Sequence, residues 1–268
     1  MNKFVRSNRA LWNELTLVHE KSEYYDLEGF MAGKSSLLPL EREEVGDVSG
    51  KKLLHLQCHF GMDTLSWARL GADVTGVDFS DKAIVLAKRL ADELKIPARF
   101  VLSDIYDVPD VLNDSFDIVL TTYGVLCWLP DLKPWAEIIA HYLKPGGMFY
   151  IADGHPFTSV FDNDHDSPDF KVAYSYFQNT EPLCFECDGD YADPDARVTN
   201  PSHEWIHRLS DIINALINAG LRIEFLHEFP MATHAHFSCM KQDEIGWYHL
   251  PKGRDRLPML FSLKAIKP

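Results

Sequence analysis

This 268-residue sequence lacks long apolar runs, a paired set of cysteines and an excess of positive charge. No stretch approaches the roughly eighteen consecutive apolar residues of a membrane-spanning helix, so we expect no membrane span. Five cysteines, an odd number scattered along the chain, do not suggest a disulfide framework, which favours a reducing cytoplasm. Residues 1–25 are polar and interrupted by charges, which is untypical of a signal peptide.

The shortage of positive charge limits the class of partner. The formal net charge is −14, and Lys and Arg are dispersed rather than gathered in a stripe. Proteins that grip nucleic acid usually neutralise its phosphates with such a stripe. We therefore expect a small-molecule partner, with no nucleic acid and no membrane, while the oligomeric state stays open.

From residue 52 onward, strand and helix patterns alternate. We expect strands at 52–57, 73–79, 98–104, 116–124 and 148–154, with helices between them at 62–72, 80–96 and 128–144. Ser80 is the expected N-cap of the second of these helices, and Pro145 ends the third. The inward-facing helix residues are predicted to be Leu65, Ala68, Leu70, Ile84, Leu86, Ala87 and Leu90. Such alternation implies a doubly wound, mostly parallel sheet with helices on both faces.

The rest of the chain is expected to decorate this core within a single domain, 1–268. Residues 1–45 predict a helical cap, and 50–154 form the regular core. Residues 155–205 and 230–257 are inserts, the first with a predicted hairpin between 170–178 and 183–189. A helix at 209–221 and strands at 222–229 and 258–268 complete the pattern. Long inserts of this kind often carry binding residues.

Several motifs in the core occur in a characteristic order. They are KLLHLQCHFG (52–61), GVDFS (76–80), VLSDIY (101–106), FDIVLTTYGVLCWLPD (116–131) and LKPGG (143–147). In this series the chain resembles the class I S-adenosylmethionine (SAM)-dependent methyltransferases over about residues 50–155. The resemblance implies a Rossmann-like sheet of seven strands, SAM as cofactor and S-adenosylhomocysteine (SAH) as product.

Two acids end consecutive strands of this series. The resemblance implies that Asp78 accepts the ribose hydroxyls and that Asp104 accepts the adenine amino group, with Ile105 beside the ring. Open α/β sheets bind ligands at this carboxyl edge. Each acid also has a local alternative: Asp78 as a helix N-terminal acid and Asp104 as a turn cap.

The first loop departs from the family pattern. Where the family has acid-x-Gly-x-Gly-x-Gly, this chain has His55, Gln57, His59 and Gly61. That departure counts against a pyrophosphate-containing dinucleotide such as NAD, whose binding needs close backbone approach. It counts less against SAM, which has no phosphate. The full set of expected cofactor residues is Gln57, Cys58, His59, Gly61, Thr64, Asp78, Phe79, Ser80, Asp104, Ile105, Tyr123 and Gly124.

Residues for the acceptor are harder to choose from the sequence. His155 follows the fifth strand and could take a proton from the acceptor, although a structural histidine is as consistent with its position. Tyr123 is the other candidate catalytic residue, since its ring could face the sulfonium. The expected substrate-binding residues are His19, Tyr24, Trp128, His155 and Trp205.

The sequence also offers a possible metal site and alternatives to the expected function. Cys184 and Cys187, with His234 and His236, raise a zinc site, but the Cys-x-x-Cys pair lies in an expected strand and has no second pair. We therefore expect no metal. The expected function is methyl transfer from SAM to a small molecule. The alternatives are a SAM-binding protein without activity, a macromolecule methyltransferase, and a nicotinamide-dependent oxidoreductase that this loop disfavours.

Overall fold

The computed structural model describes residues 2–162, 170–177, 181–186, 189–253 and 255–268. Its central feature is a seven-stranded sheet in the order β3-β2-β1-β4-β5-β12-β8. The strands are β1 Lys52–Leu56, β2 Asp73–Asp78, β3 Arg99–Leu102, β4 Phe116–Thr122, β5 Leu143–Gly154, β8 Arg222–Phe229 and β12 Leu260–Ile266. Strand β12 is antiparallel to both neighbours, and the other paired strands are parallel. The predicted mostly parallel sheet of seven strands is confirmed.

Helices cover both faces of this sheet. One face carries α3 Pro39–Val45, α4 Met62–Arg69 and α5 Asp81–Leu94; the other carries α6 Val108–Val111, α7 Leu132–Tyr142 and α8 Leu209–Asn218. Side chains alternate along β1, so Leu54 and Leu56 join the core under α6 to α8, whereas Leu53 joins the core under α3 and α4. The central strands are therefore apolar on both faces.

The helix patterns are confirmed with one exception. Ile84 and Leu90 of α5 are buried, and the Ser80 hydroxyl accepts the Ala83 N–H at 3.1 Å as the N-cap. Leu65 is buried in α4, but Leu70 is 41% exposed, so the prediction that it packs inward is wrong. The reason is that α4 ends at Arg69, and the chain turns outward there.

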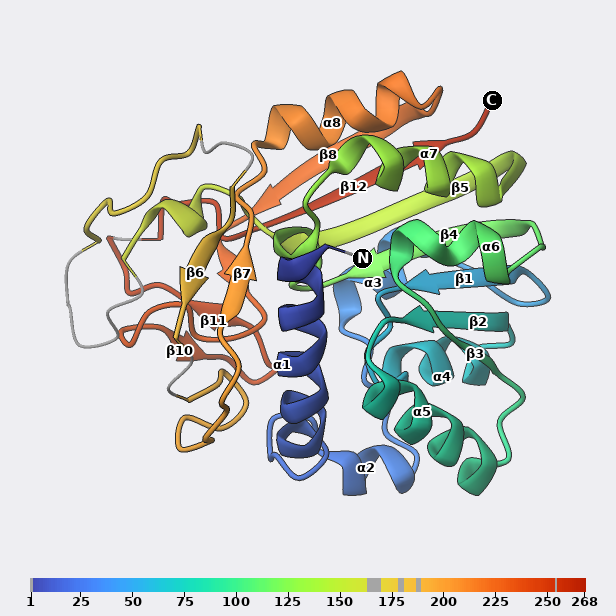
Figure 1. Ribbon diagram of the computed structural model, residues 1–268, viewed down its shortest axis with the longest axis horizontal. Coiled ribbons are helices and arrows are strands. Elements are labelled where there is room, and N and C mark those ends of the chain that lie inside the picture. Colours follow the sequence, from blue (N-terminus) through green and yellow to red (C-terminus); the bar gives the residue numbers. More distant parts are fainter. Residues whose placement is uncertain (1, 163–169, 178–180, 187–188, 254) are drawn as a thin grey trace.

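The N-terminal cap consists of α1 Lys3–His19 and α2 Leu27–Met31, followed by α3. Helix α1 lies across the carboxyl ends of the central strands, between the sheet and the inserts (Figure 1). It contacts α5 on one side and the insert strand β7 Ser202–Glu204 on the other. Asn8 makes two side-chain hydrogen bonds to the backbone of His203, at 2.7 and 2.8 Å. The cap therefore joins the core to the first insert.

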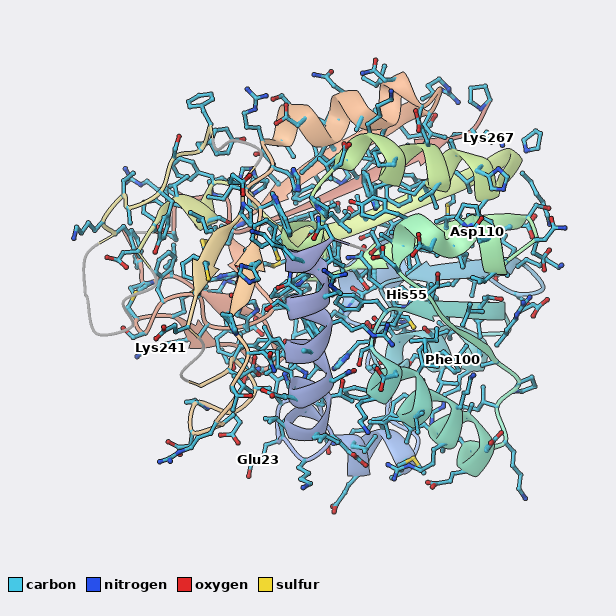
Figure 2. All side chains as sticks on the ribbon, in the orientation of Figure 1. Glu23, His55, Phe100, Asp110, Lys241 and Lys267 are labelled. Carbon is cyan, nitrogen blue, oxygen red and sulfur yellow. The ribbon has the colours of Figure 1, made fainter. Side chains whose placement is uncertain are left out.

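The inserts form small sheets rather than the predicted hairpin. Strand β6 Leu183–Phe185 pairs antiparallel with β7, not with 170–178, of which only 170–177 is described. Strand β7 is fixed to the core because the Trp205 N–H donates to Cys127 O at 2.8 Å, so it offers β6 a better-held partner. The second insert holds β9 Met231–Ala232, β10 Lys241–Gln242 and β11 Tyr248–His249 in one sheet. Figure 2 shows Lys241 on this insert, across α1 from His55 of β1.

Three short 3₁₀ turns complete the described elements: η1 Ile105–Asp107, η2 Leu126–Trp128 and η3 Thr158–Val160. Within the described ranges, no helix has the length and apolar character needed to cross a bilayer.

Candidate functional site

Two loops with unusual backbone conformations meet at the carboxyl edge of the sheet. In the loop after β1, Gln57 has φ 56° and His59 has φ 50°; after β4, Tyr123 has φ 54°. Positive φ is uncommon outside glycine, and such conformations concentrate at functional sites. Gln57 and His59 stand at the two positions where the family pattern has glycine. The loop therefore keeps a glycine-like conformation without those two glycines.

Side-chain hydrogen bonds hold these conformations in place. Gln57 Nε2 donates to Val125 O at 2.9 Å, which joins the loop after β1 to the loop after β4. The His59 ring bonds to His19 of α1 at 3.0 Å. These bonds offset part of the backbone strain, and glycine could make neither of them.

Two glycines in the loops have different surroundings. A Cβ on Gly61, which has φ 80°, would lie 2.6 Å from the Phe100 ring, so this glycine is required by packing against the core. A Cβ on Gly124, which has φ 74°, would meet no atom within 4 Å. Of these two glycines, only Gly124, after β4, has open space beside it.

The two acids lie at the edge where they were expected. Asp78 ends β2, and its carboxylate accepts the N–H groups of His59 and Ser80, both at 2.8 Å. Asp104 follows β3, and its Oδ1 accepts the Tyr106 N–H at 3.1 Å, so it also caps η1. Burial raises the pKa of Asp78 to about 6 and raises the pKa of Asp104. Each carboxylate keeps lone pairs for ligand hydroxyl or amino groups.

Four of the expected cofactor residues use their side chains within the protein. Thr64 Oγ1 pairs with His55 Nδ1 at 2.9 Å, with both side chains buried. Cys58 and Ile105 lie in core clusters. The Ser80 hydroxyl, besides capping α5, donates to Asn13 at 2.7 Å. Any contact of these residues with a ligand would therefore involve mainly their backbone.

Phe79 is the exception in this group, because its side chain is only half-buried. It follows Asp78 directly, at the end of β2. Its position leaves an apolar ring surface at the edge of the sheet.

Three buried polar atoms at this edge have no hydrogen-bond partner among the described residues: Trp12 Nε1, Gln57 Oε1 and His59 Nδ1. They are close together, since the Trp12 and His59 rings are 5.2 Å apart and Gln57 shares a loop with His59. Leaving a buried donor or acceptor unpaired costs about 1–3 kcal/mol. The arrangement fits SAM, whose ammonium could donate to Gln57 Oε1 and whose carboxylate could accept from Trp12 Nε1. Trp12 is not among the cofactor residues predicted from the sequence.

Three of the expected acceptor residues lie around these loops. His19 is buried beside His59. The Tyr24 hydroxyl donates to Thr233 O of the second insert at 3.1 Å. Trp128 Nε1 donates to Gly124 O at 2.6 Å, and its ring contacts Trp12 at 5.3 Å. The cap and both loops therefore share one aromatic wall.

The other two expected acceptor residues have structural surroundings. Trp205 is buried, with its ring 6.2 Å from that of Phe4. His155 is 5% exposed; its Nε2 bonds to Glu228 at 2.8 Å and its Nδ1 accepts the Phe157 N–H at 3.1 Å. Because both ring nitrogens are engaged, His155 has no free lone pair for a proton. These bonds favour the structural histidine, which connects the end of β5 to β8, while the role of a base stays a prediction.

Tyr123 reveals a residue that sequence reasoning missed. Its hydroxyl donates to Glu41 Oε2 of α3 at 2.6 Å, and Glu41 Oε1 accepts the Leu38 N–H at 2.5 Å. Glu41 is 1% exposed, and burial, helped by the negative charge of Asp63, raises its pKa to about 8. Nothing in the segment LEREEV distinguishes this glutamate from its neighbours.

Asp153 was also missed. It is buried at the end of β5 and accepts the N–H groups of Gly124, Val125 and Leu126 at 2.5, 3.2 and 3.0 Å. Its carboxylate thereby fixes the loop after β4. An acid directly after the apolar run MFYIA is a signal that could have found it.

Neither a metal cluster nor an obvious hollow explains this edge. The described residues contain no group of three or more His, Cys, Asp or Glu side chains arranged to hold a metal ion. Cys184 is exposed, and Cys187 lies outside the described residues. Two surface hollows, one beside α3 and one between β8 and the segment at 255–258, include no residue of the loops after β1 and β4.

Known proteins match part of this chain in sequence. A family model described as a methyltransferase domain matches residues 54–151. The chain is 31% identical over 135 residues to the ubiquinone biosynthesis O-methyltransferase of Photorhabdus laumondii, covering 49% of this chain and 56% of that protein. The chain thus spans little more than half the length of the curated relatives that it matches.

Solved structures share the fold across most of the chain. A SAM-dependent methyltransferase from Mesorhizobium loti superposes with a TM-score of 0.60 at 21% identity, covering 88% of this chain and 99% of that one. The geranyl diphosphate C-methyltransferase of Streptomyces coelicolor, solved with Mg²⁺, geranyl diphosphate and SAH, gives a TM-score of 0.53 at 14% identity over 85% and 77% of the two chains. At these identities the structural likeness concerns the fold.

Proposed function

We propose that this chain, whose residues 54–151 match a methyltransferase-domain model, is a class I SAM-dependent methyltransferase that transfers a methyl group from SAM to a small-molecule acceptor. The observation that carries the proposal is the presence at the carboxyl edge of two buried groups without a partner among the described residues, Trp12 Nε1 and Gln57 Oε1. The loop that carries Gln57 contacts Asp78, which ends β2, through the His59 backbone N–H, and Asp104 follows the neighbouring strand β3. Together they provide donors and acceptors for both ends of SAM.

Each of these residues would bind a different part of SAM. Asp78 would bind the ribose hydroxyls and Asp104 the adenine amino group, while Gln57 and Trp12 would hold the amino-acid end. Bound SAM supplies the methyl group, with a neutral thioether as leaving group. The open side of Gly124 leaves room for the reacting atoms. The chain's main task is then to align the two reactants and exclude water.

The cap and the inserts support a lid over the acceptor. Helix α1 crosses the edge. Tyr24, which follows α1 in the cap, donates a hydrogen bond to Thr233 O of the second insert. Ligand exchange would therefore require the cap or an insert to move. Aromatic rings from these segments favour a partly apolar acceptor. The names of the curated relatives favour a hydroxyl oxygen as the atom methylated, and the net charge of −14 disfavours nucleic acid.

The test begins with calorimetric titration of the protein with SAM, SAH and NAD. We expect micromolar binding of SAM and SAH and none of NAD. Asp78→Ala should weaken SAM by about 1–3 kcal/mol because the ribose hydroxyls lose their acceptor. A panel of phenols and catechols, with SAH formation as the readout, then tests transfer. Absence of SAM and SAH binding would refute the proposal, and binding without transfer to any acceptor class would favour a SAM-binding protein without activity.

A further inference from the structure

Three ionisable side chains from different parts of the sequence, those of Asp190, His19 and His59, form a linear series of hydrogen bonds. Asp190 of the first insert bonds through Oδ1 to His19 Nε2 at 2.8 Å. The other nitrogen of His19, Nδ1, bonds to His59 Nε2 at 3.0 Å. The side chain of His19 is fully buried, and that of Asp190 is 9% exposed. This series of hydrogen bonds thus runs from the first insert, through α1, to the loop after β1.

For a neutral His19, the chemistry of these groups fixes the direction of the donors. An ionised carboxylate only accepts, so His19 Nε2 must donate to Asp190. With a neutral His19, Nδ1 is an acceptor, and His59 Nε2 must donate to it. A neutral His59 then carries its free lone pair on Nδ1. That atom is buried and has no partner among the described residues.

We propose that His59 is the catalytic base, with Nδ1 taking the proton from the acceptor's hydroxyl, and that His19 and Asp190 are its positioning residues. The proposal rests on the methyl transfer proposed above. The hydroxyl oxygen forms a bond to the methyl carbon while the carbon–sulfur bond breaks and its electron pair stays on sulfur. The hydroxyl proton moves to Nδ1, so His59 leaves the step as an imidazolium. Water takes that proton before the next turnover.

The surroundings of His59 suit this role. The rings of Trp12, Tyr25 and Phe60 surround it at centroid distances of 5.2, 5.7 and 4.3 Å. Burial lowers the pKa of His59, so the ring is neutral before the step. Once His59 is protonated, the negative charge of Asp190 stabilises it through His19.

Other charged and titratable groups near these three residues come from the elements packed against them. They are Asp78, whose carboxylate accepts the His59 backbone N–H, Tyr25 of the cap, and Tyr191 of the first insert. Asp190 reaches His19 only when the first insert lies on α1. The position of His59 therefore depends on the contact between the cap and the first insert.

Nitrogen NMR of protein labelled in its histidine rings tests the assignment without any acceptor. With and without saturating SAH, we expect His59 as the Nε2–H tautomer with an unprotonated Nδ1, and His19 with Nε2 protonated. Asp190→Asn should alter the His19 signals, whereas Asp195→Asn, an exposed position on the same loop, should not. A protonated His59 Nδ1, or an Nδ1 that becomes hydrogen-bonded when SAH binds, would overturn the proposal.

Kinetics then separate the base from the cofactor site. With the phenol or catechol that yields SAH in the panel, His59→Gln should lower kcat about 10²–10⁴-fold while SAH affinity changes less than threefold. Asp190→Asn should lower kcat more modestly and shift the acidic limb of the pH profile, with Asp195→Asn unchanged. Full activity of His59→Gln would refute the base. Failure of the wild-type protein to bind SAM would instead refute the proposed function.

Discussion

The buried carboxyl of Glu41 offers a sharp test of the electrostatics beside the candidate site. Its folded-state pKa of about 8 lies above the ordinary value of 4.5, mainly because burial disfavours the charge and Asp63 adds to it. The folded protein therefore holds this proton more strongly than the unfolded chain does. The resulting stability is fully present below about pH 4.5 and is lost as the pH rises to about 8.

The magnitude follows from linkage. Stability should fall by up to about 1.4 kcal/mol per pH unit across this interval, or roughly 5 kcal/mol in all. Glu41→Gln mimics the protonated carboxyl, because the amide is uncharged and its Oε1 can accept the Leu38 N–H. We expect the variant to match the wild type near pH 4.5 and to be 3–5 kcal/mol more stable at pH 8.5, about the size set by that linkage.

Urea unfolding across pH 4.5–8.5 measures this difference directly. The comparison with the wild type cancels the other titrating groups, and Glu43→Gln on the same helix is the matched control because Glu43 is exposed. The control should give a difference independent of pH. If the Glu41→Gln and wild-type curves ran parallel over this range, the buried, protonated carboxyl that we infer would be ruled out.

Three further predictions concern the loops and their supports. Gly61→Ala should destabilise the protein by about 2–4 kcal/mol, because the added Cβ meets Phe100 at positive φ. Adding Phe100→Leu to this variant should recover part of the lost stability in thermal unfolding. No recovery would count against the packing explanation. Asp153→Asn should cost about 1–3 kcal/mol, because its amide cannot accept all the N–H groups of the loop after β4; unchanged urea stability would contradict this. His155→Ala should lower stability while leaving kcat within about threefold, and a loss of kcat larger than about 10²-fold in the folded variant would support its role as a base.

The regular core could be predicted because its signals are local. Each central strand is an apolar run buried on both faces, and α5 shows helical spacing after a serine cap. The position of Asp78 at the end of β2 followed from the same reading, and the family resemblance carried in those motifs is confirmed. The roles of Asp78 and Asp104 toward SAM stay predictions.

Groups that depend on distant partners could not be predicted from local patterns. The predicted insert hairpin is wrong because β6 pairs with a strand that is anchored to the core through Trp205, a contact far away in the sequence. His155 looked available as a base because Glu228, which engages its ring, comes from another strand. Glu41 is one of three similar glutamates, and only its burial against Tyr123 sets it apart.

The loop after β1 shows most clearly which features follow from the sequence and which depend on the tertiary structure. By itself, the sequence determined that a loop with His59 follows a buried strand that carries His55 at a ligand-binding edge, because strand position depends on local apolar pattern. Only the tertiary structure decided that Gln57 and His59 take glycine-like backbone conformations and that His59 is bonded through His19 to Asp190. Those features require Val125, α1 and the first insert to meet the loop, and long-range packing brings them there.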